Sequence, residues 1–494
     1  MNEMECAIVE FSVYIQNNGR VLKAQSGEKL LTVLQKWGLA PDAPCGGRGT
    51  CGKCKVIVNG TEVLACHTEV KQDMEVVLPG DSKTDILTES VNVDVMADGA
   101  SEYVAAFDIG TTTVVCYLLD GRTGGELRQA SCVNPQSQYG ADVISRIQYA
   151  MDTDAAALSG CIRQALDRLL LEVSAEEGID PGRIGIIAIV GNTAMHHLLL
   201  GIDPKPLTVP PYMPNISTAL TLKGDALFTV CPEAEIRILP NIAGFVGADT
   251  VGCLVATRFD TVEELTLMID IGTNGEMVLG NKDRRIACST AAGPAFEGAK
   301  IQCGMRGAVG AVDHVRLENG AISWSVIGDA EAVGLCGSGL LDLVACLLAN
   351  EDISESGRMT SGERFVLEGT DVFLSQKDVR EVQLAKAAIR AGIELMCVRL
   401  GVKPEDIRKV YLAGAFGNYM DPASACAIGM IPPVLQNRIE PIGNAAGAGS
   451  RLCALSAEEF SYSSRLAEGT EFLELASMPE FNDCYVDCLL FEEE

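Results

Sequence analysis

The chain has 494 residues, of which 48% are hydrophobic and 21% are charged, a length that suggests about three domains at roughly 150 residues each. No apolar run reaches the roughly 18 residues that cross a bilayer, and the N-terminus carries no basic and apolar leader, so we expect a cytoplasmic protein with no membrane partner. The net charge of −29 argues against a nucleic-acid partner, because phosphate contacts need clustered positive charge.

The first 80 residues predict a small β-grasp domain. Residues 10–16 largely alternate apolar and polar side chains, residues 17–19 supply a turn, and residues 20–24 form a returning strand, which together indicate a β-hairpin. A short apolar helix follows, with Ser26 as its expected N-cap and Glu28 as a favourable anion in its first turn. The order strand, strand, helix, cysteine loop, strand is typical of a β-grasp unit.

Four cysteines in this region have the spacing of a metal centre. They are separated by five, two and eleven residues, and they are Cys45, Cys51, Cys54 and Cys66. Four thiolates hold a 2Fe-2S cluster, and the glycines between them provide the positive φ angles that a loop around a cluster needs. Four-cysteine zinc is the alternative, but zinc ribbons usually carry two Cys-x-x-Cys pairs and only one is present. The loop resembles that of the 2Fe-2S ferredoxin family.

Two similar strand-turn-strand motifs lie about 160 residues apart. In each, an apolar strand ends at an aspartate and runs into a glycine turn with polar side chains. The first contains Asp108, Gly110, Thr111, Thr112 and Thr113, and the second Asp270, Gly272, Thr273, Asn274 and Gly275. Such turns bind phosphate through their amides, and the two aspartates can hold Mg²⁺ through water. Two copies predict two related lobes that share one ligand.

A third motif, residues 410–418, is an apolar strand that enters a glycine-rich turn where a base or ribose can approach the backbone. Its expected binding residues are Gly414, Ala415 and Gly417. Over roughly residues 104–450 the three motifs resemble the actin-like and sugar-kinase ATPase superfamily, which implies an ATP site. The expected organisation is a ferredoxin-like domain at 1–80, a linker at 81–103, a first ATPase lobe at 104–260 and a second at 261–494.

Two further residues are catalytic candidates beside the aspartates. Asn192 stands where sugar kinases have an aspartate as general base, and because an amide cannot take a proton, it favours orienting a water over transfer to a sugar. Glu297 is the nearest candidate for a base that activates water. Residues 334–340 either line a base pocket or pack closely. His196 and His197, adjacent on a helix and therefore not on one face, are expected to be structural. The expected catalytic residues are Asp108, Asp270, Asn192 and Glu297.

The whole chain resembles the reductive activators of corrinoid proteins, most closely at residues 191–194, 239–249 and 292–298. The resemblance implies an ATP-hydrolysing activase that passes one electron from its 2Fe-2S cluster to cobalt(II), giving cobalt(I) for methyl transfer. Its partners would be a corrinoid protein as acceptor and a low-potential electron donor. Two alternatives stay open: a small-molecule kinase with a ferredoxin redox sensor, and an ATP-switched redox module with another acceptor. The oligomeric state, a homodimer included, also stays open.

Overall fold

The described residues of the N-terminal domain form a five-stranded mixed sheet and one helix. The computed structural model describes residues 10–79 and 96–491, except residues 18, 38, 42, 44–46, 48, 50, 51, 154 and 361. The strands of this domain are β1 (Glu10–Ile15), β2 (Arg20–Gln25), β3 (Lys55–Val58), β4 (Thr61–Leu64) and β5 (Met74–Val77), in the order β2-β1-β5-β3-β4. Only β1 and β5 run parallel. The β-grasp prediction is therefore confirmed, including the β1-β2 hairpin.

Helix α1 (Leu30–Lys36) covers this sheet with Leu30, Leu31, Val33 and Leu34 buried. Its N-cap is Lys29, so the N-cap predicted at Ser26 is wrong. The preceding residues are held by a neighbouring segment instead, since Gly27 N donates to Val70 O and Val70 N donates to Glu28 O, both at 2.8 Å. The helix can begin only after these bonds end.

The first lobe is built on a six-stranded sheet in the order β10-β11-β9-β6-β7-β8. Its strands are β6 (Tyr103–Ile109), β7 (Thr113–Asp120), β8 (Glu126–Val133), β9 (Ile184–Gly191), β10 (Leu220–Lys223) and β11 (Glu235–Ile238). Its helices are α2 (Val143–Asp152), α3 (Ala155–Glu176), α4 (Thr193–Leu200) and α5 (Ala248–Thr257). Alternate residues of β6 enter two different cores, because successive side chains of a strand face opposite sides of the sheet.

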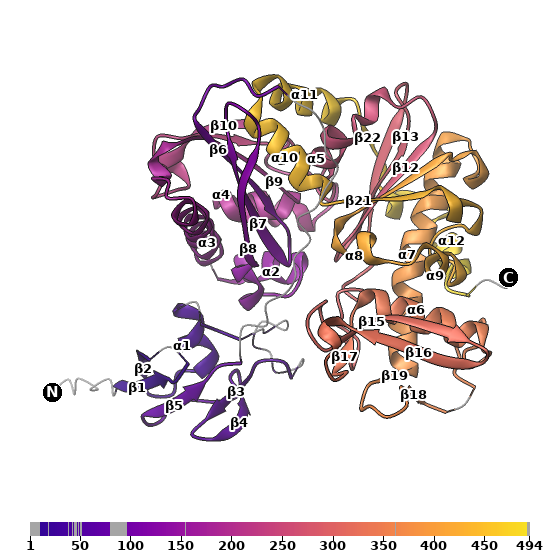
Figure 1. Ribbon diagram of the computed structural model, residues 1–494, viewed down its shortest axis with the longest axis horizontal. Coiled ribbons are helices and arrows are strands. Elements are labelled where there is room, and N and C mark those ends of the chain that lie inside the picture. The colour runs from indigo at the N-terminus through magenta and orange to yellow at the C-terminus, as the bar shows by residue number, and fades with distance from the viewer. Residues whose placement is uncertain are drawn as a thin grey trace.

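The second lobe repeats this topology in the order β21-β20-β12-β13-β14-β22. Its strands are β12 (Thr266–Ile271), β13 (Gly275–Gly280), β14 (Arg285–Thr290), β20 (Lys409–Ala413), β21 (Ile439–Gly443) and β22 (Glu471–Phe472). In each lobe an antiparallel three-stranded meander is followed by two strands added in parallel beside its first strand. The predicted two-lobed actin-like and sugar-kinase fold is confirmed (Figure 1).

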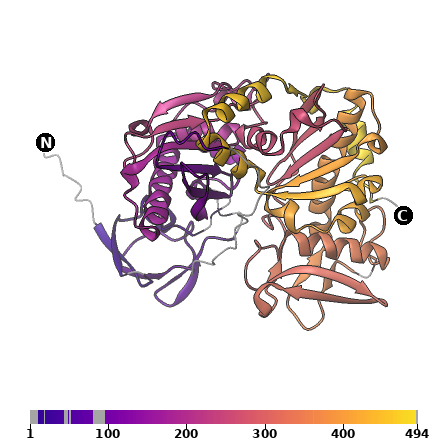
Figure 2. The same ribbon diagram turned by 45° about the horizontal axis from the view of Figure 1, so that its top comes forward.

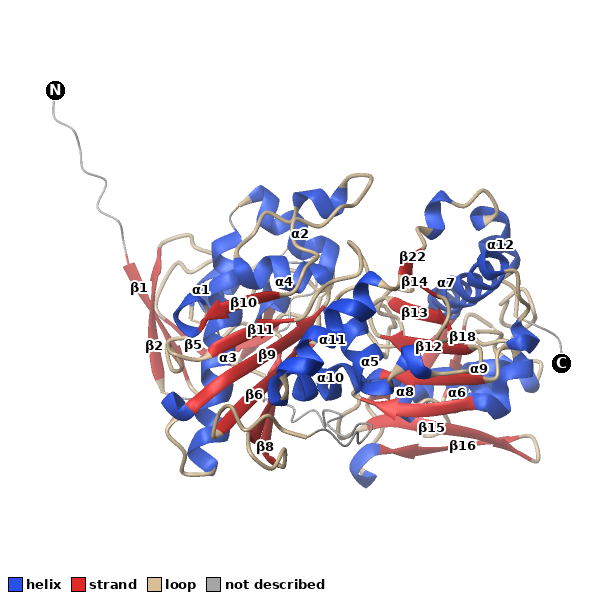
Figure 3. Cartoon of the chain, turned by 90° about the horizontal axis from the view of Figure 1, so that it is seen from above, coloured by secondary structure: helices blue, strands red, loops and turns tan. Residues whose placement is uncertain are grey.

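Three helices fill the space between the two sheets: α5, α10 (Ala445–Leu455) and α11 (Ala457–Glu468). Figure 3 shows them between the red strands of the two lobes. Helices α10 and α11 follow β21 of the second sheet but pack on α5, and α10 also on β6 and β9 of the first sheet. The range 261–494 predicted for the second lobe thus includes two helices that belong to the core between the lobes.

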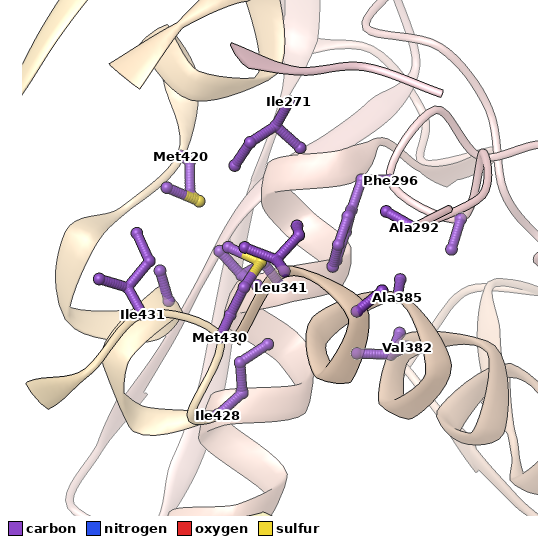
Figure 4. Close-up of a cluster of buried hydrophobic side chains, with 14 of the residues drawn as sticks. Ile271, Ala292, Phe296, Leu341, Val382, Ala385, Met420, Ile428, Met430 and Ile431 are labelled. Carbon is purple, nitrogen blue, oxygen red and sulfur yellow. The ribbon is translucent and has the colours of Figure 1, made fainter. Parts of the chain in front are cut away.

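The far face of the second sheet is covered by α6 (Gly337–Ala349), α7 (Gln376–Leu400) and α9 (Pro422–Ala427). Figure 4 shows part of this core, in which Ile271, Phe296 and Leu341 lie close to one another. Two small sheets extend the lobe: β16 (Ala321–Val326), β15 (Ala311–Glu318) and β17 (Gly334–Leu335), and β18 (Arg364–Val366) with β19 (Phe373–Ser375). The remaining helices are α8 (Gly414–Tyr419) and α12 (Phe481–Asp487).

The N-terminal domain lies next to the first lobe (Figure 1; Figure 2). Residues 81–95 of the predicted linker lie outside the described residues. The residues that follow are bonded to the helices between the lobes, because Asp98 N donates to Leu455 O at 3.0 Å and Ala457 N donates to Asp98 Oδ2 at 2.6 Å. The chain is therefore anchored before β6 begins.

Candidate functional site

The two predicted phosphate loops are the turns β6-β7 and β12-β13. In the first, Gly110 N donates to Thr113 O at 2.9 Å, and in the second, Gly272 N donates to Asn274 O at 2.9 Å. A Cβ on Gly110 would lie 2.9 Å from Thr113 O, so this tight turn has no room for a side chain. Each loop follows a strand whose penultimate residue is the predicted aspartate, Asp108 in β6 and Asp270 in β12, so each strand runs one residue further than the sequence predicts.

Glu297 joins the two loops. Thr112 of the first loop donates through Oγ1 to Glu297 Oε2 at 2.6 Å, and Thr273 of the second donates through Oγ1 to Glu297 Oε1 at 2.8 Å. Both carboxylate oxygens are thus used, one for each lobe. A carboxylate that accepts two hydroxyl hydrogen bonds occupies a position where an oxyanion is favoured.

Asn192 lies beside the first loop because β6 and β9 are parallel neighbours whose carboxyl ends meet at one edge of the sheet. It is the N-cap of α4, where its Oδ1 accepts from Met195 N at 2.9 Å. Its Nδ2 donates to Thr111 Oγ1, also at 2.9 Å. The amide is therefore fixed at both ends, with its orientation set by the helix that it caps.

A segment that the sequence did not single out, residues 134–146, holds the back of the first loop; we call it the bracket segment. Asn134 donates through Nδ2 to Gly110 O and through its backbone N to Thr112 O, both at 2.8 Å. Arg146 donates through Nη2 to Thr111 O at 2.6 Å. Three consecutive carbonyls of the loop therefore point at the bracket segment. Since C=O and N–H point in opposite directions in a planar trans peptide, the amides of Thr111, Thr112 and Thr113 point away from it.

Arg146 is the central residue of the bracket segment. It is fully buried, and its Nε donates to Gly140 O at 2.9 Å. Burial lowers the pKa of Arg146 to about 10, so the guanidinium stays charged at neutral pH behind the loop. A buried cation at this place favours an anion on the other side of the loop. The sequence signal was an isolated arginine in an amphipathic helix, which by itself predicts a solvated residue.

Four carboxylates gather between the lobes: Asp108, Asp249, Asp270 and Glu276. Burial raises the pKa of Asp108 to about 7, although the hydrogen bond that Asn444 Nδ2 donates to it at 2.9 Å acts in the opposite direction and lowers the pKa. Burial, with the neighbouring charges of Asp249 and Asp108, raises the pKa of Asp270 to about 7. Burial likewise raises the pKa of Asp249 and of Glu276.

None of these four carboxylates forms an ion pair with a lysine, arginine or histidine among the residues that the structure describes. A group of half-buried carboxylates without a protein cation fits a divalent metal ion, which prefers oxygen ligands and reverses the unfavourable burial of the charges. The sequence predicted Asp108 and Asp270 but missed Asp249, which lies in the first turn of α5, and Asn444, the N-cap of α10. Both come from helices that reach the site only through tertiary packing.

The third motif joins the site through β20, which pairs in parallel with β12 so that Ala413 is opposite Asp270. Gly414 has φ +82°, and a Cβ there would lie 2.6 Å from Asp270 Oδ1. Gly417 is buried and Ala415 is exposed. The residues predicted as a turn form the short helix α8 instead. The motif therefore borders the acidic cluster directly.

An aromatic pair connects this motif to Glu297. The rings of Phe296 and Phe416 stack at a centroid distance of 4.8 Å with 12° between their planes. Gly337 packs against both, since a Cβ on it would lie 2.1 Å from Phe296 O. Of the two interpretations left open for residues 334–340, close packing accounts for this glycine.

Of the four predicted cluster ligands, Cys45 and Cys51 lie outside the described residues. Cys54 and Cys66 are both buried, and the backbone of Cys54 is bonded to the residue before Cys66, since Ala65 N donates to Cys54 O at 2.8 Å. The described part of the loop folds over them: Gly47 has φ +82°, and a Cβ on it would lie 4.0 Å from Cys66 Cβ. Buried thiols under a glycine loop with positive φ angles fit an iron-sulfur cluster.

The two histidines are not a metal site. His197 donates through Nδ1 to Thr193 O at 2.7 Å and accepts from Asn215 N at 3.0 Å through Nε2. Burial lowers the pKa of His196 to about 3, and its ring nitrogens find no hydrogen-bond partner among the described residues. Both are therefore neutral helix residues in the protein interior.

The fold and the site define a class: two-lobed proteins of the ASKHA type that carry a ferredoxin domain. Residues 264–494 match the family described as the C-terminal domain of RACo, the ASKHA domain; residues 103–262 match the RACo middle region; and residues 13–78 match the 2Fe-2S iron-sulfur cluster binding domain. The chain thus has a 2Fe-2S domain and an ATP-binding fold, as the sequence predicted. No described helix has the length and apolar character of a membrane span.

Relatives narrow the class further. The corrinoid activation enzyme RamQ of Eubacterium limosum is 38% identical over 418 residues, 79% of this chain and 70% of the relative. The Co(II) methylated amine-specific corrinoid protein reductase of Methanosarcina barkeri is 27% identical over 78% of this chain and 76% of its own length. The solved structure of a reductive activator for corrinoid, iron-sulfur protein matches with a TM-score of 0.72 and 26% identity, over 97% of this chain and 98% of that one. The chain belongs to the RACo family of reductive activators.

Proposed function

We propose that this protein uses ATP hydrolysis to drive one electron from its 2Fe-2S cluster to the cobalt(II) of a corrinoid protein. The acceptor becomes cobalt(I), and the cluster is left oxidised until a low-potential donor returns the electron. The observation that carries this proposal is the convergence of two phosphate loops, one from each lobe, on Glu297 in a chain that also has a cluster domain. The activities named for the two relatives of known function support it.

Different groups of described residues would bind the phosphates, the metal ion and the adenosine of the nucleotide. The amides of Thr111, Thr112 and Thr113 face away from the bracket segment and would bind phosphate oxygens together with the second loop, Gly272 to Gly275. Asp108 and Asp270, with Asp249 and Glu276, would hold Mg²⁺, which supplies charge neutralisation at the phosphates when bound. Gly414, Ala415 and Gly417 would border the adenosine.

Glu297 would activate the attacking water, and Asn192 would position the first loop beside it. Glu297 accepts the proton as the water oxygen bonds to the γ-phosphorus and the bond to the leaving oxygen of ADP breaks. Asn192 cannot accept this proton, but its fixed amide orients the first loop through Thr111 Oγ1. The four ligand candidates, Cys45, Cys51, Cys54 and Cys66, would hold the cluster that supplies the electron.

The test follows the electron paramagnetic resonance signal of a cobalt(II) corrinoid protein. The corrinoid protein is mixed without oxygen with the chemically reduced full chain, with and without Mg-ATP. We expect the cobalt(II) signal to disappear only when Mg-ATP is present. Persistence of the signal with a panel of corrinoid proteins, while ATP is still hydrolysed, would show that the acceptor is wrong.

A further inference from the structure

The N-terminal domain contacts the first lobe at the bracket segment. Gln35, on α1, donates through Nε2 to the backbone carbonyl of Gln138 at 2.6 Å. Gln35 is half-buried there, and Gln138 is only 7% exposed. Figure 1 shows α1 below α2 of the first lobe. Among the described residues, this hydrogen bond is thus made by helix α1.

Helix α1 is also bonded to the segment that carries a predicted cluster ligand. Leu31 N donates to Ala65 O at 3.0 Å, and Leu30 N donates to Thr68 O at 2.8 Å. Cys66 lies between these two acceptors. One end of α1 is therefore attached to the cluster side of the domain, and the other end carries Gln35.

On the first lobe, the residue that accepts from Gln35 belongs to a part of the bracket segment that is hydrogen-bonded to the phosphate loop and to α3. Asn134 caps the short 3-10 helix Pro135–Gln138 by accepting from Gln136 N at 3.0 Å. Gln136 is fully buried and donates through Nε2 to Leu158 O at 3.1 Å. Asn134 is the same residue that binds Gly110 O and Thr112 O of the phosphate loop. Only three residues separate Asn134, which contacts the loop, from Gln138, which contacts the domain.

We infer that the bracket segment is the docking surface of the cluster domain, and that docking and nucleotide binding strengthen each other. The bracket segment holds three loop carbonyls and so directs the loop amides to the phosphates. A docked cluster domain restrains the bracket segment and reduces the ordering that nucleotide binding requires. By reciprocity, nucleotide strengthens docking by the same factor. This inference rests on the proposed nucleotide site. It adds that bound nucleotide favours docking of the cluster domain on the first lobe.

The charge and geometry favour the cluster domain as the occupant of this surface. The acceptor is a backbone carbonyl, and Gln35 is a neutral donor whose partner is already present in the chain. The domain is joined to the ATPase lobes by the chain itself, so it binds at a high effective concentration and a single hydrogen bond, that of Gln35, suffices for docking. Because the coupling is weak, docking can be reversed when nucleotide leaves.

The test uses the full chain and two glutamine variants of the same domain. Gln35→Ala removes the donor, while Gln72→Ala changes an exposed glutamine for which the described residues provide no partner. Nucleotide affinity is measured with a non-hydrolysable ATP analogue and Mg²⁺ by calorimetry. We expect Gln35→Ala to raise Kd about two- to tenfold, the range of one net hydrogen bond, and Gln72→Ala to leave it unchanged.

Hydrogen exchange gives the reciprocal readout. In the unmodified chain we expect the analogue to slow amide exchange in α1, residues 30–36, and this response to be lost in Gln35→Ala and kept in Gln72→Ala. Gln35→Glu, which keeps the size but cannot donate when ionised, behaves like Gln35→Ala. The visible absorption of the cluster shows that each variant is folded.

The inference is overturned if Gln35→Ala retains both the Kd and the exchange response of the unmodified chain, or if Gln72→Ala changes them equally. Neither measurement contains a corrinoid protein. If the cobalt(II) signal persists but Gln35→Ala changes the Kd and the exchange response as expected, the acceptor is rejected and the docking surface is retained. Absence of nucleotide binding in the unmodified chain would reject both.

Discussion

Glu297→Gln is the substitution that separates the chemical role of Glu297 from its structural one. The carboxylate accepts from Thr112 at 2.6 Å and from Thr273 at 2.8 Å. A glutamine keeps one acceptor oxygen and its size, and a threonine hydroxyl can rotate to accept from the new amide. Replacing two charge-assisted hydrogen bonds by neutral ones costs about 1 to 2 kcal/mol of folding stability. The lobes therefore stay assembled.

The effect on turnover is much larger, because the amide cannot take a proton from water. Loss of a general base lowers kcat by about 10²- to 10⁴-fold, which is about 3 to 5 kcal/mol of transition-state stabilisation. Nucleotide affinity does not fall, since the substitution removes a negative charge next to the phosphates. The low kcat with an unchanged or lower Kd identifies a residue that acts on the reaction.

The assay measures phosphate release by the full chain with Mg-ATP, alongside nucleotide Kd by calorimetry. Glu331→Gln is the matched control, because Glu331 is an exposed glutamate of the same lobe with no hydrogen bond or ion pair among the described residues. An unchanged kcat in Glu297→Gln would refute the base assignment. A kcat loss matched by an equal loss of nucleotide binding would show that Glu297 only joins the loops.

Three further predictions concern other parts of the site. The pKa values of Asp108 and Asp270 are both raised to about 7, so the folded protein binds more protons than the unfolded chain between about pH 4 and pH 7. Its Tm without metal should therefore fall as pH rises through this window, and Mg-ATP should reduce the fall. A Tm that does not change with pH would contradict the acidic cluster. Arg146→Met leaves the carbonyls of Gly140 and Thr111 without their donor and should lower the free energy of unfolding, measured in urea, by about 2 to 4 kcal/mol; Arg146→Lys should lower it less. Equal stability of the two variants and the unmodified chain would show that the guanidinium does not hold the loop. Cys54→Ser should remove the visible absorption of the cluster and keep nucleotide binding within about tenfold, and a retained 2Fe-2S spectrum would exclude Cys54 as a ligand.

Much of the fold could be predicted from local pattern. The β1-β2 hairpin, the two strand-turn-strand motifs and the order of the three nucleotide motifs depend on short-range periodicity and on glycine turns, which neighbouring residues dictate. The N-cap of α1, Lys29, could not be predicted, because the segment at Val70 pairs with the residues before the helix. A contact between segments about 40 residues apart in the chain overrode a local capping preference.

The candidate site depends even more than the fold on contacts between distant segments, which the sequence does not show. Glu297 was a weak candidate in the sequence, and its hydrogen bonds to both lobes exist only because the two sheets face each other. Asp249 lies in the first turn of α5 and Asn444 caps α10, two helices that fill the space between the lobes, so nothing near them in the sequence indicates an acidic cluster. Arg146 reads as a surface residue until α2 is packed against the first loop.

By itself the sequence determined the kinds of chemistry available: a four-cysteine loop, two glycine turns that follow aspartates, and an asparagine where a general base could stand. These depend on residue type and spacing along the chain, which are local properties. Only the tertiary structure decided which groups meet. Three features each bring together at least one pair of residues more than 90 positions apart in the chain. They are the convergence of the two loops on Glu297, the four carboxylates without a protein cation among the described residues, and the contact of Gln35 with the bracket segment. Burial then alters the electrostatics of these groups, because a charge removed from water depends on the partners that the fold brings to it.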